Sequence, residues 1–189
     1  MQGVTDIQRT SAVVLVEGIS DQRALEALAE RLGRDLAAEG VAIVPIGGAQ
    51  AIGRYLERFG PRGSNLRLAG LCDEGEEIHF RRALERAGFG SDLTRADMEE
   101  LGFYVCVRDL EDELVRSVDA ADLERLIAAE GEQRRFDTFR KQLAKRDLSY
   151  EELLYGFMWN RKSRYATLIV QTLDLARVPR PLEGVLAHV

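Results

Sequence analysis

Acidic residues stand close behind three of the apolar runs in this sequence. Glu17 follows the run V-V-L-V, Asp73 follows residues 66–72, and Asp109 comes two residues after the run F-Y-V-C-V. Further acids lie a few positions downstream of these three: Asp21, Glu74, Glu76, Glu77, Glu111, Asp112 and Glu113. Carboxylates gathered in one crevice repel one another unless cations neutralise them, and Mg²⁺ and Mn²⁺ prefer oxygen ligands. If the fold brings these acids together, the pattern indicates a divalent-metal site.

The apolar runs themselves are typical of buried strands. Four short apolar runs occupy residues 11–16, 41–46, 66–72 and 103–107, and the first of them is rich in β-branched residues. Apolar residues at helical spacing follow each run, at residues 20–33, 49–59, 78–87 and 110–118. Strands that alternate with helices predict an α/β fold with a largely parallel, Rossmann-like sheet and flanking helices. The carboxyl ends of such strands meet at one edge, so the acids are expected at one site.

The last third of the chain has a different pattern. Its segments 119–130, 133–146, 149–159 and 162–176 all read as helices. We therefore predict two parts, an α/β domain at residues 1–118 and a helical C-terminal extension at residues 119–189 that packs on it.

Charge divides the chain unevenly as well. The net charge is −6, but residues 131–189 hold 11 basic and 7 acidic side chains and are therefore basic, with a net charge of +4. Many of the basic residues fall in one zone that could contact a nucleic-acid backbone, although exposed helices often carry charge only for solvation. This zone comprises Arg134, Arg135, Arg140, Lys141, Lys145 and Arg146.

Four sequence motifs, in order over residues 11–113, resemble a known family. The string V-V-L-V-E-G-I-S-D-x-x-A-L resembles the opening motif of a Toprim domain, and its second acid, Asp21, resembles the version in nucleases of the OLD family (overcoming lysogenization defect). The P-I-G-G turn, the strand that ends at Asp73 and the string D-L-E at residues 109–111 follow in that family's order. The resemblance implies Mg²⁺- or Mn²⁺-dependent cleavage of DNA with two metals, one near Glu17 and Asp73 and one held with the help of Asp21 and Glu111.

The third motif departs from the family pattern. The family usually has D-x-D, whereas this chain has Asp73, Glu74 and then Gly75. Two alternatives stay open: Glu76 or Glu77 reaches the same metal with its longer side chain, or that metal contact is lost. The family also places a lysine before an alanine-containing helix, where it could stabilise charge on the cleaved phosphate. The resemblance thus implies a catalytic set and an overlapping metal-binding set: Glu17, Asp73 and Lys162, and Glu17, Asp21, Asp73, Glu76 and Glu111.

Structural roles remain open for several of these residues. Asp21 lies where a helix macrodipole favours an acid, Asp109 could cap a helix together with Asp112, and Lys162 could belong to a solvated basic turn. The pair Gly47-Gly48 could let the backbone approach a phosphate or could be an ordinary turn. Two other functions are therefore kept: a Toprim module that binds nucleic acid or a partner protein with little or no catalysis, and, less favoured, a receiver-like signalling domain.

Other features restrict the class of protein. Cys72 and Cys106 lie in apolar runs and provide no disulfide framework, and the two histidines, His79 and His188, form no metal cluster. The sequence has no apolar run long enough to span a membrane and no export signal at its start, so we expect a cytoplasmic protein. OLD proteins usually carry an ABC-type ATPase ahead of the Toprim part, and this sequence has no Walker A string. We therefore expect a stand-alone Toprim protein with DNA as its partner and a separate ATPase as a further candidate partner.

Overall fold

A parallel sheet forms the centre of the α/β part. The computed structural model describes residues 10–142, 145, 147–159 and 161–189. Within them, strands β1 (Ala12–Val16), β2 (Val41–Pro45), β3 (Arg67–Asp73) and β4 (Phe103–Cys106) pair in the order β2-β1-β3-β4, all parallel. The five residues of β1 are all buried because this strand is central and both faces of the sheet are covered. The predicted fold class is confirmed.

One face of the sheet packs against three helices. These are α2 (Ile52–Phe59), α3 (Glu77–Ala87) and α4 (Arg95–Glu100). Val13 and Leu15 of β1 point to this side, as alternate residues of a strand must, and join Phe80 and Phe103 in its core. Gly70 leaves room for the Phe103 ring, since a Cβ on Gly70 would lie 2.6 Å from that ring.

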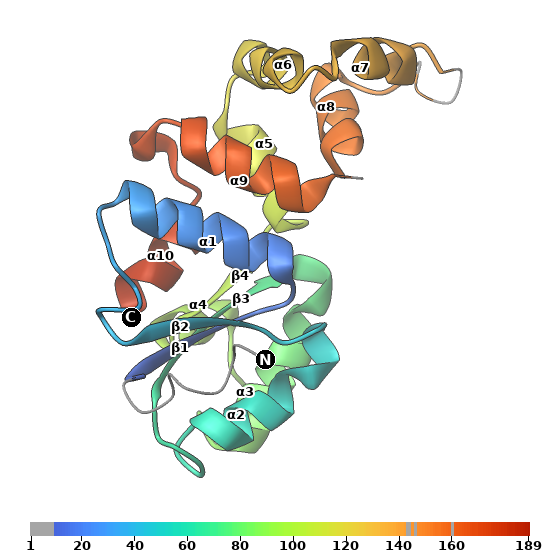
Figure 1. Cartoon of the computed structure of the whole chain (residues 1–189). Coiled ribbons are helices and arrows are strands. Elements are labelled where there is room, and N and C mark those ends of the chain that lie inside the picture. Colours follow the sequence, from blue (N-terminus) through green and yellow to red (C-terminus); the bar gives the residue numbers. More distant parts are fainter. Residues whose placement is uncertain (1–9, 143–144, 146, 160) are drawn as a thin grey trace.

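The opposite face carries helices from both ends of the chain. Val14 and Val16 contribute to a core with α1 (Ile19–Arg31) and α10 (Arg180–His188). Helix α9 (Lys162–Thr172) lies along α1, and α5 (Leu110–Ser117) follows β4 and packs against α9 (Figure 1). This core continues without a break into the C-terminal helices.

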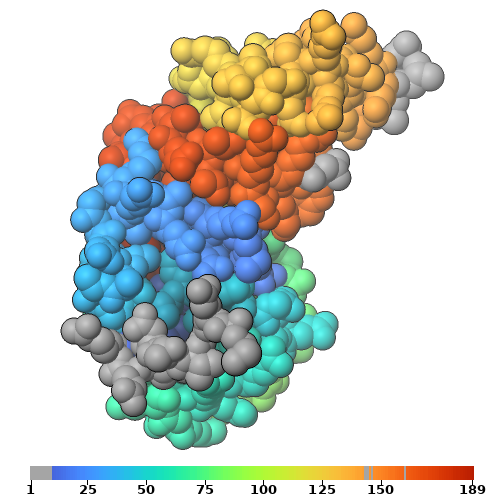
Figure 2. All heavy atoms as spheres, viewed as in Figure 1, coloured from blue at the N-terminus to red at the C-terminus, as the bar shows by residue number. Residues whose placement is uncertain are grey.

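The C-terminal helices extend away from the sheet. Helices α6 (Ala120–Ala129), α7 (Gln133–Arg140) and α8 (Tyr150–Trp159) form one end of an elongated molecule, seen in yellow and orange in Figure 2. Their packing is largely aromatic: the Phe136 and Phe157 rings lie 5.2 Å apart and Phe157 and Tyr165 lie 6.3 Å apart, each in an edge-on arrangement.

Arginines from the N-terminal part hold the C-terminal helices. Arg31 donates hydrogen bonds to the carbonyl oxygens of Val170 and Leu173, at 2.7 and 2.6 Å, at the end of α9. Arg34 donates in the same way to the carbonyls of Leu186 and Val189. The end of the chain therefore returns to the α/β part. The boundary near residue 118 stays a prediction.

The elements differ from the sequence-based expectation in a few places. Helices α4 and α10 were not predicted, α7 ends at Arg140, and α9 ends at Thr172 before a short 3-10 turn at Leu175–Arg177. Cys72 and Cys106 are buried and unbridged, as expected. None of the described helices is long and apolar enough to cross a membrane.

Candidate functional site

Glu17 lies in the turn between β1 and α1, at the carboxyl edge of the sheet. Its side-chain Oε1 accepts the backbone N–H of Asp73 at 3.0 Å, which links the ends of β1 and β3. Its carbonyl oxygen accepts the N–H groups of Gly47 and Gly48 at 3.1 and 3.2 Å. These two glycines have φ values of 76° and 106°, which other residues rarely adopt. The Gly-Gly turn therefore positions the Glu17 backbone, and its N–H groups are already engaged there.

Asp73 is the most perturbed carboxylate of this edge. Burial and then repulsion from Glu17 raise the pKa of Asp73 to about 8, and three more acids add to the repulsion: Asp21, Asp109 and Glu111. The structure thus brings five acids from the ends of β1, β3 and β4 near one another. We name Glu17, Asp21, Asp73, Asp109 and Glu111 the carboxylate cluster.

Two members of the carboxylate cluster also have structural roles. Asp21 Oδ2 accepts the N–H of Gly18 at 2.8 Å and so caps the start of α1, while burial raises the pKa of Asp21. Asp109 uses both oxygens: it caps α5 by accepting the N–H of Asp112 at 2.8 Å, and it accepts the Tyr155 hydroxyl at 2.5 Å. The predicted N-cap role of Asp109 is confirmed. The Asp112 carboxylate itself lies 2.7 Å from Arg116 Nε.

Glu111 and Lys162 meet although they are far apart in the sequence. Glu111 is 5% exposed, and its Oε1 is buried with no hydrogen-bond partner among the described residues. Lys162, the first residue of α9, places its Nζ 4.0 Å from this oxygen. Burial raises the pKa of Glu111, and the ammonium of Lys162 opposes that rise. The same ammonium opposes the rise in the pKa of Asp21 and of Glu17, so Lys162 acts on three of the five acids of the carboxylate cluster.

Of the acids that follow Asp73, two form ion pairs with one arginine, and Glu76 does not contact that arginine. Glu77 lies 2.5 Å from Arg95 and Glu74 lies 3.3 Å from the same arginine, so both are engaged in ion pairs. Glu76 lies 3.6 Å from His79, and its charge contributes to raising the pKa of Glu17. Of the two substitutes considered for the missing aspartate, Glu76 is therefore better placed than Glu77.

Two residues of the site were not anticipated from the sequence. Arg95 fixes Glu74 and Glu77, and Tyr155 holds Asp109; burial and this hydrogen bond raise the pKa of the Tyr155 hydroxyl. The sequence T-R-A-D, in which Thr94 caps α4, could have indicated the helix that carries Arg95. The sequence around Tyr155 contains no pattern that would predict its contact with Asp109.

The donor set of the site suits a hard divalent cation. Its members are carboxylate oxygens, and Glu111 Oε1 is a buried acceptor that has no hydrogen bond to satisfy it. Across the described part of the chain, however, no three His, Cys, Asp or Glu side chains are arranged closely enough to hold one ion together. Glu17, Asp21 and Asp109 instead accept hydrogen bonds from neighbouring backbone N–H groups.

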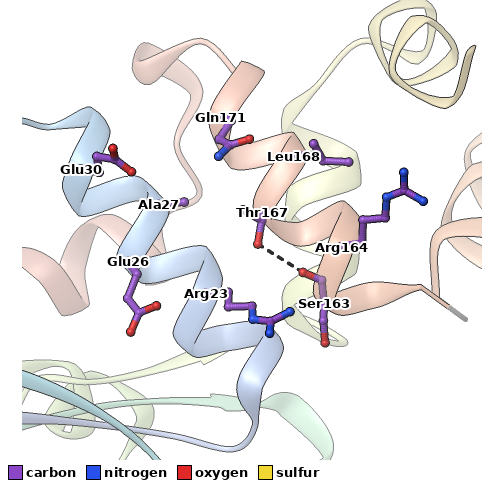
Figure 3. A pocket seen from close by; sticks show the side chains of 9 residues that line it. All are labelled: Arg23, Glu26, Ala27, Glu30, Ser163, Arg164, Thr167, Leu168 and Gln171. Atoms are coloured by element: carbon purple, nitrogen blue, oxygen red, sulfur yellow. Dashed lines mark hydrogen bonds between the residues drawn. The ribbon is translucent and has the colours of Figure 1, made fainter. Parts of the chain in front are cut away.

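A groove of about 510 Å³ runs between α1 and α9 and begins near their N-terminal ends, at Arg23 and Ser163. Figure 3 shows Arg23 reaching from α1 towards the first turn of α9, with Arg164 on the other side. Glu26 and Glu30 line the same groove. Two arginines and two glutamates line the groove, so it carries no net charge that would favour an anion.

The parallel sheet and its N-terminal segment are similar to a Toprim domain. Residues 10–73 match the family model described as the TOPRIM domain of overcoming lysogenization defect protein-like proteins. Residues 10–73 are therefore similar to an OLD-like TOPRIM domain, as the resemblance of the motifs in this segment indicated. No curated protein matches the sequence.

Solved structures extend the similarity to nearly the whole chain. The C-terminal region of the Xanthomonas campestris pv. campestris OLD protein superposes with a TM-score of 0.78 at 24% identity, over 98% of this chain and 94% of that one. The C-terminal region of the Burkholderia pseudomallei OLD protein gives a TM-score of 0.71 at 21% identity, over 95% and 96%. The helices after residue 118 thus belong to the same shared fold.

Proposed function

We propose that this protein is a divalent-metal-dependent nuclease that hydrolyses phosphodiester bonds of DNA. The observation that carries the proposal is the carboxylate cluster with Lys162 beside it, at the carboxyl edge of an OLD-like TOPRIM domain. The acids of the cluster outnumber the one ammonium beside them. Such a site favours the binding of metal ions to the acids and of an anionic substrate to those ions and to the ammonium.

The residues divide into two sets of ligands. Glu17 and Asp73 would hold one Mg²⁺ or Mn²⁺, with Glu76 in place of the second aspartate of the usual motif, and Asp21 and Glu111 would help to hold a second. Such ions would neutralise the charge of the phosphate and would lower the pKa of a water molecule bound to them.

The chain's own groups add two further contributions. The Lys162 ammonium, 45% exposed at the edge of the cluster, can accompany a phosphate oxygen and stabilise the charge that develops on it. Asp73, with its pKa near 8, holds a proton at neutral pH as long as the neighbouring acids are not neutralised. A cation in the cluster would release that proton, so binding is expected to strengthen as the pH rises.

A second function is favoured by one specific observation. Gly75 supplies no ligand where the family pattern has an aspartate, which supports a Toprim module that binds nucleic acid or a partner protein with weak or absent catalysis. A separate ATPase partner and a cytoplasmic location remain predictions.

The substitution Gly75→Asp distinguishes the two functions. An ideal Cβ on Gly75 meets no atom within 4 Å, so an aspartate fits without displacing a neighbour. We expect weak nicking of supercoiled plasmid by the native protein with Mn²⁺, an increase for Gly75→Asp, and no activity for Gly75→Asp combined with Glu17→Ala. Gly75→Asn is the matched control, since it adds the same bulk without the carboxylate.

Two results would redirect the proposal. Robust native cleavage that Gly75→Asp slows would mean that Glu76 already completes the site. If neither form cleaves while both bind metal and DNA, the binding module replaces the nuclease.

A further inference from the structure

A second hollow of about 440 Å³ opens beside the carboxylate cluster. It lies between α8, the end of α7 and Arg108. Three aromatic side chains line it, Phe139, Tyr155 and Trp159, together with the cations Arg108 and Lys145. We name these five residues the aromatic groove.

The aromatic groove is joined directly to the proposed catalytic site. The Tyr155 hydroxyl donates to Asp109 of the carboxylate cluster at 2.5 Å. The Lys162 Nζ lies 4.0 Å from Glu111 Oε1 and 4.9 Å from the centre of the Trp159 ring, so one ammonium group contacts both the cluster and the groove. A ligand that places a phosphate at Lys162 would therefore have its neighbouring groups at Trp159.

Trp159 is unusually open for its type. It is 40% exposed, although a large aromatic ring is normally covered in a soluble domain. Its ring lies 5.7 Å from that of Tyr155 with an angle of 41° between the planes, so the two rings do not stack flat on each other. The open face of Trp159 lies in the same hollow as Tyr155 and Phe139, so the three rings together offer an aromatic surface to a ligand.

Positive charge accompanies each ring. The Arg108 guanidinium lies 3.8 Å from the centre of the Tyr155 ring, and Lys145 Nζ lies 4.9 Å from that of Phe139. Glu152, the acid that lines the hollow, accepts the backbone N–H of Ser149 at 2.7 Å and is engaged at the start of α8. Flat apolar faces beside cations match the bases and phosphates of an unpaired nucleic-acid strand, because every base has a face that stacks on an aromatic ring.

We propose that the aromatic groove binds unpaired nucleotides next to the phosphodiester bond held at the carboxylate cluster, with a base stacked on Trp159. This inference rests on the proposed action on nucleic acid and specifies its substrate: a single-stranded or locally opened segment. The preference comes from stacking, so it should depend on strand state more than on base sequence.

The test uses the fact that Trp159 is the single tryptophan of the chain. Titration of the whole protein with a short oligothymidylate in EDTA, where no metal-dependent cleavage occurs, should quench its fluorescence. A duplex of the same length should quench less at equal concentration. For variants, anisotropy of a labelled oligothymidylate replaces the intrinsic signal.

The variants separate stacking from general damage. Trp159→Ala should weaken oligothymidylate binding by about 5- to 150-fold, the loss expected for one stacked base. Trp159→Phe should retain most of the affinity. Leu175→Ala is the matched control because Leu175 is also 40% exposed and lies outside the groove, so it should bind like the native chain.

Failures of the two proposals can be told apart. Absence of quenching, or equal affinity of Trp159→Ala and native protein, overturns the assignment of nucleotides to the groove and favours a partner protein there. If the protein cleaves plasmid but oligothymidylate does not quench Trp159 fluorescence, only this inference is overturned. Quenching without any cleavage in Mn²⁺ overturns the nuclease and leaves the groove as a nucleotide-binding site.

Discussion

The carboxylate cluster should make the metal-free protein less stable as the pH rises, and Asp73→Asn should remove part of this effect. The folded-state pKa of Asp73 is about 8, against 3.8 for the free side chain. Because the pKa is raised, the folded state binds the proton more tightly than the unfolded chain does. The stability associated with the bound proton is complete below pH 4, falls between pH 4 and pH 8, and is absent above pH 8. Asparagine resembles the protonated acid, so the variant should gain most at pH 8 and almost nothing at pH 4.

The size of the effect follows from the same shift. The difference between a pKa of 3.8 and one of about 8 corresponds to at most about 6 kcal/mol, since each unit is worth about 1.4 kcal/mol. Asp73 is only partly buried, and water screens its repulsion from the neighbouring acids, so about 1–3 kcal/mol is the realistic gain at pH 8. For a chain of this length, that gain corresponds to a rise of roughly 2–10 °C in the melting temperature.

The assay is thermal unfolding in EDTA at pH 4.5, 6 and 8, with Glu26→Gln as the control for loss of an exposed acid on α1. Mg²⁺ should raise the melting temperature of the native protein at pH 8, since it binds the folded state, and should do so less for Asp73→Asn. A variant that is equally or less stable than the native protein at pH 8 would refute the reasoning. It would mean that the carboxylate stabilises this edge through contacts that outweigh the repulsion.

Two other substitutions examine neighbouring parts of the site. Titration calorimetry with Mn²⁺ should detect binding at millimolar concentrations or below, weakened at least tenfold by Glu17→Gln; unchanged binding would place the metal elsewhere. Tyr155→Phe should lower the free energy of unfolding by about 1–3 kcal/mol in urea, because it leaves an oxygen of the buried Asp109 without its donor. Tyr55→Phe, which removes only a hydroxyl 3.4 Å from an exposed arginine, is the control, and an equal loss in both variants would contradict that explanation.

The parts of the fold that could be predicted are those set by local patterns. The strands and α1 follow from continuous apolar runs and helical spacing, and the parallel order places Glu17 and Asp73 at one edge without further information. Helix α10 was missed because Pro179 and Pro181 resemble a break, although proline is well tolerated in the first turn of a helix.

The contacts that could not be predicted join distant segments. The position of Lys162 beside Glu111 depends on how α9 packs along α1 and α5, and only the family resemblance suggested it. Arg95 reaches Glu77 from a helix that follows a long turn, and Tyr155 reaches Asp109 from α8. Such pairs are decided by tertiary packing, which leaves no periodic signal in the sequence.

Much of the positive charge in the C-terminal third is engaged in ion pairs. Several arginines counted as basic charge meet acids close by: Arg135 and Arg161 both lie near Glu132, at 2.9 and 3.2 Å, and Arg164 pairs with Glu130. Arg140 similarly lies 3.3 Å from Asp137, and Arg146 is outside the described residues.

A net charge of +4 therefore does not amount to one broad basic face. Two cations lie next to the carboxylate cluster. Lys162 is 4.0 Å from Glu111, and Arg108 stacks on the tyrosine that holds Asp109 while also lying 3.4 Å from Asp112. Recognition of nucleic acid would then depend on a few short-range contacts at the site. Its affinity should accordingly show a shallow salt dependence, since that slope follows the number of phosphates neutralised.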